Sequence, residues 1–401
     1  MNFKMVGKLK LGKETEKFKP YQEVTYSSGW ANRILNFSII CGDNRHNLNI
    51  KGGTYPNKSD YKIVTFGPSG YDDNRKFIPG TRLDIPWKDR LSNDVIEKVS
   101  QNRRYVLDLD KRGRRTKLQH LLEKINGGEN ISDSELESAE IDNPSKVAEA
   151  LEESNKKRFE FISLWDYAQK VKEVLEENIL ENKKVYVEGT IEKQYSDANQ
   201  RWYESYVPQR IYLADDNEKE YSTGTATIYF NNHAVDDGSV DENGKYYVKG
   251  FTFEYDSTRK KNIPCPIQLV VLNAEDNSDE KAKGKSNILI KRFYIDDDVW
   301  MQYGVTFDML NGAQKIEITE DMLTDAQRED LEYEIITMDD IRKELGSSIY
   351  GDRVQEWRFI KPSRGYTKGP QDTKYTDDDF VIPPIKTAAD DEELFDEDDD
   401  F

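Results

Sequence analysis

The chain has 401 residues, of which 34% are charged and 36% hydrophobic, and its formal net charge is −19. This length allows two domains with separate cores, whereas two cysteines, Cys41 and Cys265, exclude a disulfide framework and a four-cysteine zinc site. No run approaches the roughly 20 apolar residues that cross a membrane, and no signal peptide is visible, so the expected location is the reducing cytoplasm.

Residues 1–128 are predicted to form a basic β domain. Residues 1–25 are rich in lysine, and only 6–11 alternate as a short strand does, so the rest is expected to be a mobile arm. A hairpin is predicted from 34–41 and 46–51. Further strands over 61–66 and 103–110 complete a sheet of about five strands, and a short helix follows over 117–126. Residues 84–88 are expected to be an edge strand or a loop, because Pro86 removes a ladder donor. Residues 1–125 contain 25 Lys and Arg against 14 Asp and Glu, a net of +11 that indicates a polyanionic partner.

Residues 129–158 are acidic, and we expect a linker there. A helix is predicted to begin at Ser163 as its N-cap, with Phe161, Trp165, Ala168, Val171 and Leu175 on one face. A second β unit then follows, with a bend or bulge expected at Gly189. Its predicted strands cover 185–194, 202–213, 225–230, 245–255 and 267–272, with more β structure at 287–295 and 315–318. Helices beginning near Thr324 and Thr337 complete a predicted domain of residues 159–346.

The C-terminal part is predicted to be a linker followed by an acidic tail. Residues 347–389 contain the Pro, Gly and Lys of a linker, and nine of the twelve residues 390–401 are acidic. Such a block cannot fold alone because it repels itself and buries almost nothing apolar. The sequence Asp-Asp-Asp-Phe ends the chain at 398–401 and also occurs at 377–380.

The predicted fold class is mainly β with a few helices (α+β), built as two OB-like five-stranded barrel units with a disordered acidic tail. Each unit has about five strands and an associated helix, and the first strand of the second unit is bent at Gly189, which fits the oligonucleotide-binding barrel. A sandwich or another small barrel has a similar strand count, so these folds stay open as alternatives.

Catalytic patterns are weak in this sequence. His46, His120 and His233 include no pair at metal-ligand spacing, and no phosphate-binding loop is present. Asp108 with Asp110, and the run 296–298, could hold a divalent metal, but a strand end and a solvated turn are the favoured interpretations. We therefore expect a protein that is not an enzyme and that has no cofactor or metal.

Cations interleaved with aromatic residues are the positive pattern, because single-strand binding needs cations for phosphates and rings for bases. The candidate nucleic-acid-binding residues are Trp30, Arg33, Arg45, Lys51, Tyr55, Lys62, Arg75, Lys76, Arg103, Arg104, Arg112, Arg114 and Arg115, with Trp202, Tyr203 and Arg210 in the second unit. Phe37 and Phe66 are expected in the core, while Trp30 and Tyr55 fit core and surface equally well. The cations of 103–117 could also be a solvated helix start.

A β domain followed by the tail Asp396–Phe401 resembles the single-stranded-DNA-binding proteins of phages and bacteria. The run 30–37 with 41–46 also looks like proteins of large phages that infect Gram-positive bacteria. The resemblance implies that Asp398, Asp399, Asp400 and Phe401 dock replication or recombination proteins, and that the tail competes with DNA.

The predicted function is therefore single-stranded DNA binding in phage-type DNA replication, recombination and repair, in the host cytoplasm and without a membrane partner. One alternative is an interaction protein whose acidic tail mimics DNA and inhibits a host nucleic-acid enzyme. Another is a nuclease that uses Asp108 and Asp110. The length and the second, acidic β unit depart from the simplest family members, so the oligomeric state stays open.

Overall fold

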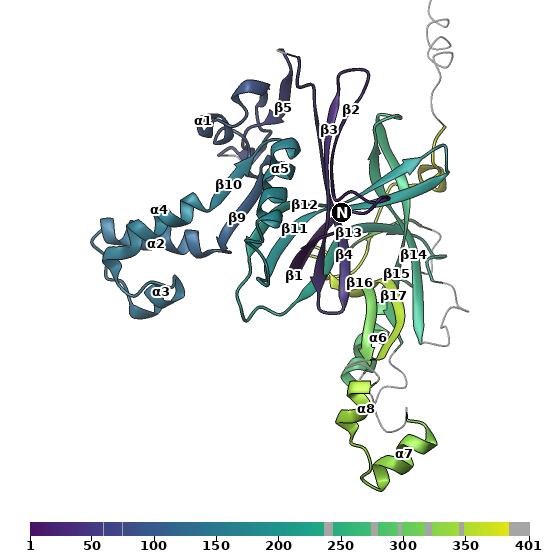
Figure 1. Ribbon diagram of the computed structural model, residues 1–401. Helices are drawn as coiled ribbons and strands as arrows, with labels where there is room; N and C mark the ends of the chain where they lie inside the picture. Colours follow the sequence, from purple (N-terminus) through teal and green to yellow (C-terminus); the bar gives the residue numbers. More distant parts are fainter. Residues whose placement is uncertain are drawn as a thin grey trace, which may run out of the picture.

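The computed structural model describes residues 1–58, 60–73, 75–235, 244–273, 280–295, 299–316, 323–344 and 349–384. Figure 1 shows strands crossing the middle of the molecule, with one group of helices (α2 to α4) extending to one side and another (α7 and α8) at one end. None of the described helices is long and apolar enough to cross a membrane.

The N-terminal strands include the predicted hairpin. β3 (Ala31–Cys41) pairs with β4 (Asn44–Thr54) in antiparallel register, which confirms this prediction. β1 (Asn2–Leu11) and β2 (Tyr21–Thr25) pair with β3. Two separate ribbons follow, which are β5 (Lys62–Phe66) with β8 (Arg82–Pro86), and β6 (Gly70–Tyr71) with β7 (Phe77–Ile78). The segment then continues through η1 (Trp87–Asp89), α1 (Asn93–Ile96), η2 (Gln101–Arg103) and β9 (Tyr105–Lys111).

The predicted linker 129–158 is folded in the structure. α2 (Arg114–Asn126), α3 (Asp133–Ser138), η3 (Pro144–Lys146) and α4 (Val147–Lys156) surround a small core of Leu118, Leu121, Leu136, Ala139 and Val147. A capping box between Ser132 and Glu135 begins α3. A few well-spaced apolar side chains are enough to hold this acidic segment against α2. The overall composition of the segment, on which the linker prediction was based, does not reveal them. β10 (Arg158–Phe161) then pairs with β9.

The helix predicted from Ser163 is confirmed as α5 (Leu164–Glu176). The Ser163 hydroxyl accepts a hydrogen bond from the Trp165 backbone N–H, and Trp165, Ala168, Val171 and Leu175 are buried along one face. The start of α5 approaches β4 closely, because a Cβ on Gly52 would lie 2.2 Å from the Trp165 nitrogen. Glycine at this position therefore sets the distance between helix and sheet.

The five predicted strands of the second unit are present as β11 (Val185–Ser196), β12 (Arg201–Leu213), β13 (Tyr221–Phe230), β14 (Lys245–Asp256) and β15 (Lys261–Leu272). Three further strands follow, which are β16 (Met301–Ile316), β17 (Ile349–Pro362) and β18 (Gln371–Asp372), and of these only the end of β16 was predicted. The register of β11 shifts between Glu188 and Gly189, so the predicted bulge is confirmed. The helices α7 (Asp325–Glu332) and α8 (Met338–Glu344) are also confirmed, and a short turn of helix, η5 (Asp377–Phe380), follows β18.

The β structure predicted at 287–295 is wrong, because these residues lie in α6 (Glu280–Lys291) and the chain that follows it. Ser286, Leu289 and Ile290 are buried with the spacing of a helix face. The strand β17 lies where the sequence predicted a linker.

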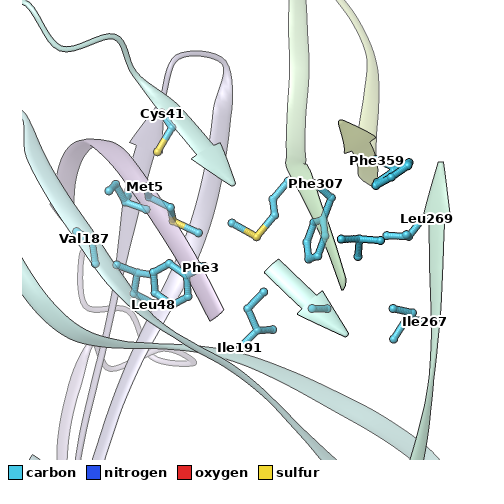
Figure 2. Close-up of a cluster of buried hydrophobic side chains, with 14 of the residues drawn as sticks. Phe3, Met5, Cys41, Leu48, Val187, Ile191, Ile267, Leu269, Phe307 and Phe359 are labelled. Atoms are coloured by element: carbon cyan, nitrogen blue, oxygen red, sulfur yellow. The ribbon is translucent and has the colours of Figure 1, made fainter. Parts of the chain in front are cut away.

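One continuous sheet joins the two predicted domains. β1 pairs with β3 and also with β11 and β13, while β9 pairs with β12. Figure 2 shows the shared core, where Phe3, Met5 and Leu48 lie in one cluster with residues of β15, β16 and β17, namely Ile267, Leu269, Phe307 and Phe359. The mainly β, α+β class is confirmed. The predicted division into 1–128 and 159–346 runs through this sheet, and the structure therefore differs from two separate five-stranded barrels.

Candidate nucleic-acid interface

The β5–β8 ribbon has one apolar face toward the protein and one exposed face. Ile63, Leu83 and Ile85 pack with Ile96 and Val99 beneath the ribbon. Because successive strand residues point to opposite faces, Lys62, Val64 and Phe66 point outward. Val64 is 53% exposed and Phe66 is 39% exposed. The expectation that Phe66 belongs to the core is therefore wrong, whereas Phe37 is buried as predicted.

The β6–β7 hairpin extends this exposed face. Tyr71 and Phe77 are 73% and 55% exposed, and their ring centroids lie 5.7 Å apart. The carboxylate of Asp72 accepts a hydrogen bond from the Lys76 backbone N–H at 2.7 Å, which closes the turn. Arg75 adopts a positive φ of 60° in this turn. The hairpin thus places two cations, Arg75 and Lys76, beside two exposed rings.

Arg103 contributes a further cation, since its guanidinium lies 5.6 Å from the centre of the Phe66 ring. Within the described residues, no side-chain ion pair involves Lys62, Arg75, Lys76 or Arg103. We call the following set the ribbon surface: Lys62, Val64, Phe66, Tyr71, Arg75, Lys76, Phe77 and Arg103. It combines exposed rings with cations that form no side-chain ion pair within the described residues.

A half-buried aromatic cluster lies between β4 and the ribbon. The Trp30 ring meets Tyr55 edge-on at 4.8 Å, Tyr55 meets Tyr61 at 5.7 Å, and Tyr61 meets Trp87 at 5.6 Å. The Trp30 Nε1–H donates to Asn32 at 2.9 Å. Burial, and secondarily the neighbouring Tyr55, raises the pKa of Tyr61. Because these rings pack on one another, each is half-buried, and less ring surface is exposed here than on Tyr71 and Phe77.

A cavity of about 190 Å³ adjoins this cluster. Tyr61, Trp87 and the exposed Lys51 contribute to its wall. Lys58 lies 4.9 Å from the centre of the Tyr55 ring, which adds a second cation. The predicted residues Trp30, Lys51 and Tyr55 are thus brought together here.

The other predicted arginines make intramolecular ion pairs. Arg104 contacts Glu160 at 2.8 Å, Arg112 contacts Glu218 at 3.1 Å, and Arg33 contacts Glu23 at 2.7 Å. Burial raises the pKa of Glu160, but hydrogen bonds from Arg104 and Arg158 outweigh burial and hold that pKa below its ordinary value. The role of these arginines in binding stays a prediction, and their charge is already compensated.

Asp108 and Asp110, the candidate metal ligands, are also compensated. Asp108 forms ion pairs with Arg115 and Arg158, and Asp110 contacts Arg114 at 3.2 Å. Burial raises the pKa of Asp110, but the hydrogen bonds that it accepts, including one from Arg114, hold the pKa below its ordinary value. A metal ion bound by Asp108 and Asp110 would have to displace the guanidinium groups of these arginines. Across the part of the chain that the structure describes, no group of three or more acidic, His or Cys side chains could hold a metal ion.

Of the candidates in the second unit, Arg210 lies near the ribbon surface, since its guanidinium donates to the Gln101 carbonyl, two residues before Arg103, at 2.9 Å. Trp202 packs against Tyr195 at 5.3 Å, and the hydroxyl of the exposed Tyr203 accepts a hydrogen bond from Asn199 at 3.0 Å. Arg210 contacts Glu188 at 2.7 Å. Arg45 is exposed at the start of β4. The tail residues Asp398, Asp399, Asp400 and Phe401 lie outside the described residues.

Phe66 and Tyr71 lie in the stretch 30–76 where cations and rings alternate, but neither was chosen as a site residue, and Phe77 lies just beyond that stretch. Two local signals could have identified them. Gly67–Pro68 and Pro79–Gly80 bracket a short segment with aromatic residues near both ends, which is typical of an excursion from a ribbon. Such an excursion has no second layer to cover its rings.

No protein-family model matches the chain, and no curated protein matches it either. Among solved structures, a deletion mutant of the single-stranded DNA binding protein from Thermus aquaticus is similar over 76% of this chain and 85% of its own. The sequence identity is 7% and the TM-score is 0.26. A similarity at this level carries no argument about fold or function.

Proposed function

We propose that this protein binds single-stranded DNA through the ribbon surface and is not an enzyme. The observation that carries the proposal is the β6–β7 hairpin, where the exposed rings of Tyr71 and Phe77 lie beside Arg75 and Lys76, two cations that form no side-chain ion pair within the described residues. Bases stack on exposed aromatic rings, and lysine and arginine contact the phosphates between them. In a duplex the faces of the bases are covered, so this arrangement favours a single strand.

The neighbouring aromatic cluster supports the same proposal. Its half-exposed rings and the cations Lys51 and Lys58 could continue a strand's path beyond the ribbon. Arg33, Arg104, Arg112, Arg114, Arg115 and Arg210 would first have to break their ion pairs, which is costly for partly buried charges. We therefore assign phosphate contacts first to Lys62, Arg75, Lys76 and Arg103.

The resemblance of the tail to phage and bacterial single-stranded-DNA-binding proteins is our ground for the finer assignment. We infer a role in phage-type DNA replication, recombination and repair, with the tail docking replication or recombination proteins. These partners have to be identified by capture experiments with the intact tail.

Titration of labelled oligo-dT with variants of the full chain tests the proposal. Tyr71→Ala and Phe77→Ala should each weaken binding by about 1–3 kcal/mol, because each removes a stacking ring. Melting temperatures should stay unchanged, since both rings are exposed. The matched control is Tyr255→Ala, because Tyr255 on β14 is 66% exposed and lies on another part of the sheet.

Equal affinity of Tyr71→Ala, Phe77→Ala and Tyr255→Ala would contradict the assignment to the ribbon. Absence of binding by the unmodified chain would instead favour the DNA-mimicking interaction protein. The titration should be repeated with Mg²⁺, and cleavage that disappears with Asp108→Asn would establish the nuclease alternative.

A further inference from the structure

The segment that follows β18 is anchored in an aromatic site of the second half. Phe380 in η5 is almost fully buried, and its ring stacks on Trp300 with 3.6 Å between centroids and 17° between planes. Phe251 and Phe253 lie 5.2 and 5.5 Å from the same ring. We call this site the Trp300 cradle, formed by Tyr229, Phe251, Phe253, Trp300 and Tyr375.

The acidic residues before Phe380 also take part in docking. The carboxylate of Asp377 accepts a hydrogen bond from the Trp300 Nε1–H at 2.7 Å. Asp379 accepts hydrogen bonds from the Thr376 backbone N–H at 2.8 Å and from its hydroxyl at 3.2 Å, which closes the helical turn. The cradle therefore recognises a ring together with an aspartate three residues before it.

The same four residues, Asp-Asp-Asp-Phe, form the end of the chain at 398–401. Seventeen residues, 385–401, follow Pro384, the last described residue, and Phe401 is the last of them. A segment of that length spans up to roughly 60 Å when extended and about 20–25 Å as a flexible coil. The terminal copy can thus reach a cradle that holds residue 380 of the same chain.

We propose that the Trp300 cradle is a binding site for Asp-Asp-Asp-Phe sequences, and that the terminal copy at 398–401 exchanges with the internal copy at 377–380. The ring of Phe401 would stack on Trp300, and Asp398 would accept the Nε1–H hydrogen bond. Only one copy fits at a time, so the other is left available to a partner. This inference does not depend on DNA binding.

The surroundings of the cradle fit a chain end. A cavity of about 860 Å³ borders Asp377 and Phe380, and Lys249 and His233 contribute to its wall. Lys249 is exposed, and no side-chain partner for it occurs in the described ranges. The α-carboxylate of Phe401, which the internal copy lacks, would find this cation nearby.

Charge does not explain binding of an acidic peptide here. Residues 183–376, which contribute all of the cradle, contain 26 Lys and Arg against 36 Asp and Glu. The long-range electrostatic force on an acidic peptide is therefore repulsive and is screened by salt. If the ring provides the affinity, binding persists at high salt.

The test measures fluorescence anisotropy of a labelled peptide of residues 390–401. The protein is the full chain with Phe401→Ala, whose own end cannot compete. Adding Phe380→Ala empties the cradle and should strengthen peptide binding at least about ten-fold, as loss of a competing buried ring requires. Trp300→Ala, added to the chain that carries Phe401→Ala and Phe380→Ala, should abolish peptide binding.

Peptide variants give a matched control within one sequence. A peptide with Phe401→Ala should not bind, whereas one with Phe395→Ala should bind unchanged, because Phe395 follows Glu-Glu-Leu and not three aspartates. Equal loss from both changes would overturn the proposal.

Asp379→Ala is a second variant that keeps the proposal testable if Phe380→Ala misfolds. It loosens the internal copy by removing the Thr376 hydrogen bonds and leaves the buried ring in place. This variant should also bind the peptide more tightly than the parent chain. Two results would overturn the proposal: no binding by either variant, or binding that disappears at high salt and with Arg75→Ala and Lys76→Ala.

Discussion

His46 shows how a single residue can be read in two ways. In the sequence it is one of three histidines in an alternating strand, whereas in the structure it is buried, with Nε2 3.0 Å from the Ser222 hydroxyl. That hydroxyl donates its only hydrogen to the Met309 carbonyl at 2.6 Å. It therefore acts as an acceptor toward His46, and Nε2 is the ring nitrogen that carries the hydrogen. Nδ1 is buried and has no hydrogen-bond partner among the described residues. A proton added there would have no acceptor.

We expect His46 to make folding stability depend on pH. Burial lowers its pKa from 6.5 to about 4, so the unfolded chain binds a proton at pH values where the folded chain does not. Stability should therefore fall as pH decreases from about 6.5 to 4, by about 2 kcal/mol between pH 7 and pH 5.

Urea denaturation of the unmodified chain and His46→Gln at both pH values checks this expectation. The variant should lose that part of the pH dependence. His120→Gln is the control, because His120 is exposed on α2. An unchanged difference between pH 7 and pH 5 in His46→Gln would show that other groups cause it.

Trp30 illustrates a residue with two roles. Its ring lies so close to β4 that a Cβ on Gly53 would be 2.0 Å from Trp30 Cζ2, and it also packs on Tyr55. We therefore expect Trp30→Ala to lower the melting temperature as well as the affinity for oligo-dT, unlike Tyr71→Ala. Calorimetry and titration on both variants separate the two effects, and an unchanged melting temperature for Trp30→Ala would contradict this packing role.

At the scale of elements, local patterns identified the hairpin of β3 and β4, the N-cap of α5 and the bulge in β11. They failed where a partner lies far along the chain. Residues 1–25 were expected to be mostly a mobile arm, yet β1 pairs with β11 and β13, whose residues lie about 180 and 220 positions later. Nothing within a lysine-rich segment reveals such a pairing.

The central position of β1 gives a prediction about its apolar side chains. Phe3 is fully buried and packs against Tyr206 at 5.7 Å, so Phe3→Ala should cost about 3–5 kcal/mol of unfolding free energy. Urea denaturation measures the loss, and Lys4→Ala on the exposed face of the same strand should cost far less. We also expect that residues 1–128 alone do not fold, because β1 then loses β11 and β13 and keeps only β3, while β9 loses both β10 and β12. A cooperative unfolding transition of that fragment would contradict this view.

Over the whole molecule, the sequence revealed where charge lies but not how it is paired. The positive surplus of residues 1–125 is real, yet Arg104 and Arg112 pair with Glu160 and Glu218, which belong to the acidic regions that follow. Net charge by segment therefore overstated the cationic surface around 103–117. On the ribbon surface, by contrast, Lys62, Arg75, Lys76 and Arg103 form no side-chain ion pair with any later segment of the described chain.

The docked position of Phe380 changes how the acidic tail should be removed. A deletion from Asp377 would take away a buried ring and the Trp300 hydrogen bond together with the charge. Deleting residues 385–401 leaves that segment intact and removes nine acidic residues and one lysine, a net charge of −8. Only this second deletion separates the effect of tail charge from an effect on the fold.

If the tail competes with DNA for the ribbon surface, deleting 385–401 should increase affinity for oligo-dT, mostly at low salt where charges are weakly screened. Tethering gives the tail an effective concentration near the millimolar range, so even weak contacts occupy part of the surface. Phe401→Ala keeps all nine acids, and it should leave DNA affinity nearly unchanged while it reduces capture of tail-binding partners. Titrations of the three proteins at two salt concentrations decide the matter. An affinity that falls or stays the same at low salt after the deletion would mean that the tail does not compete, because removing a tethered polyanion from a cationic surface can only favour a second polyanion there.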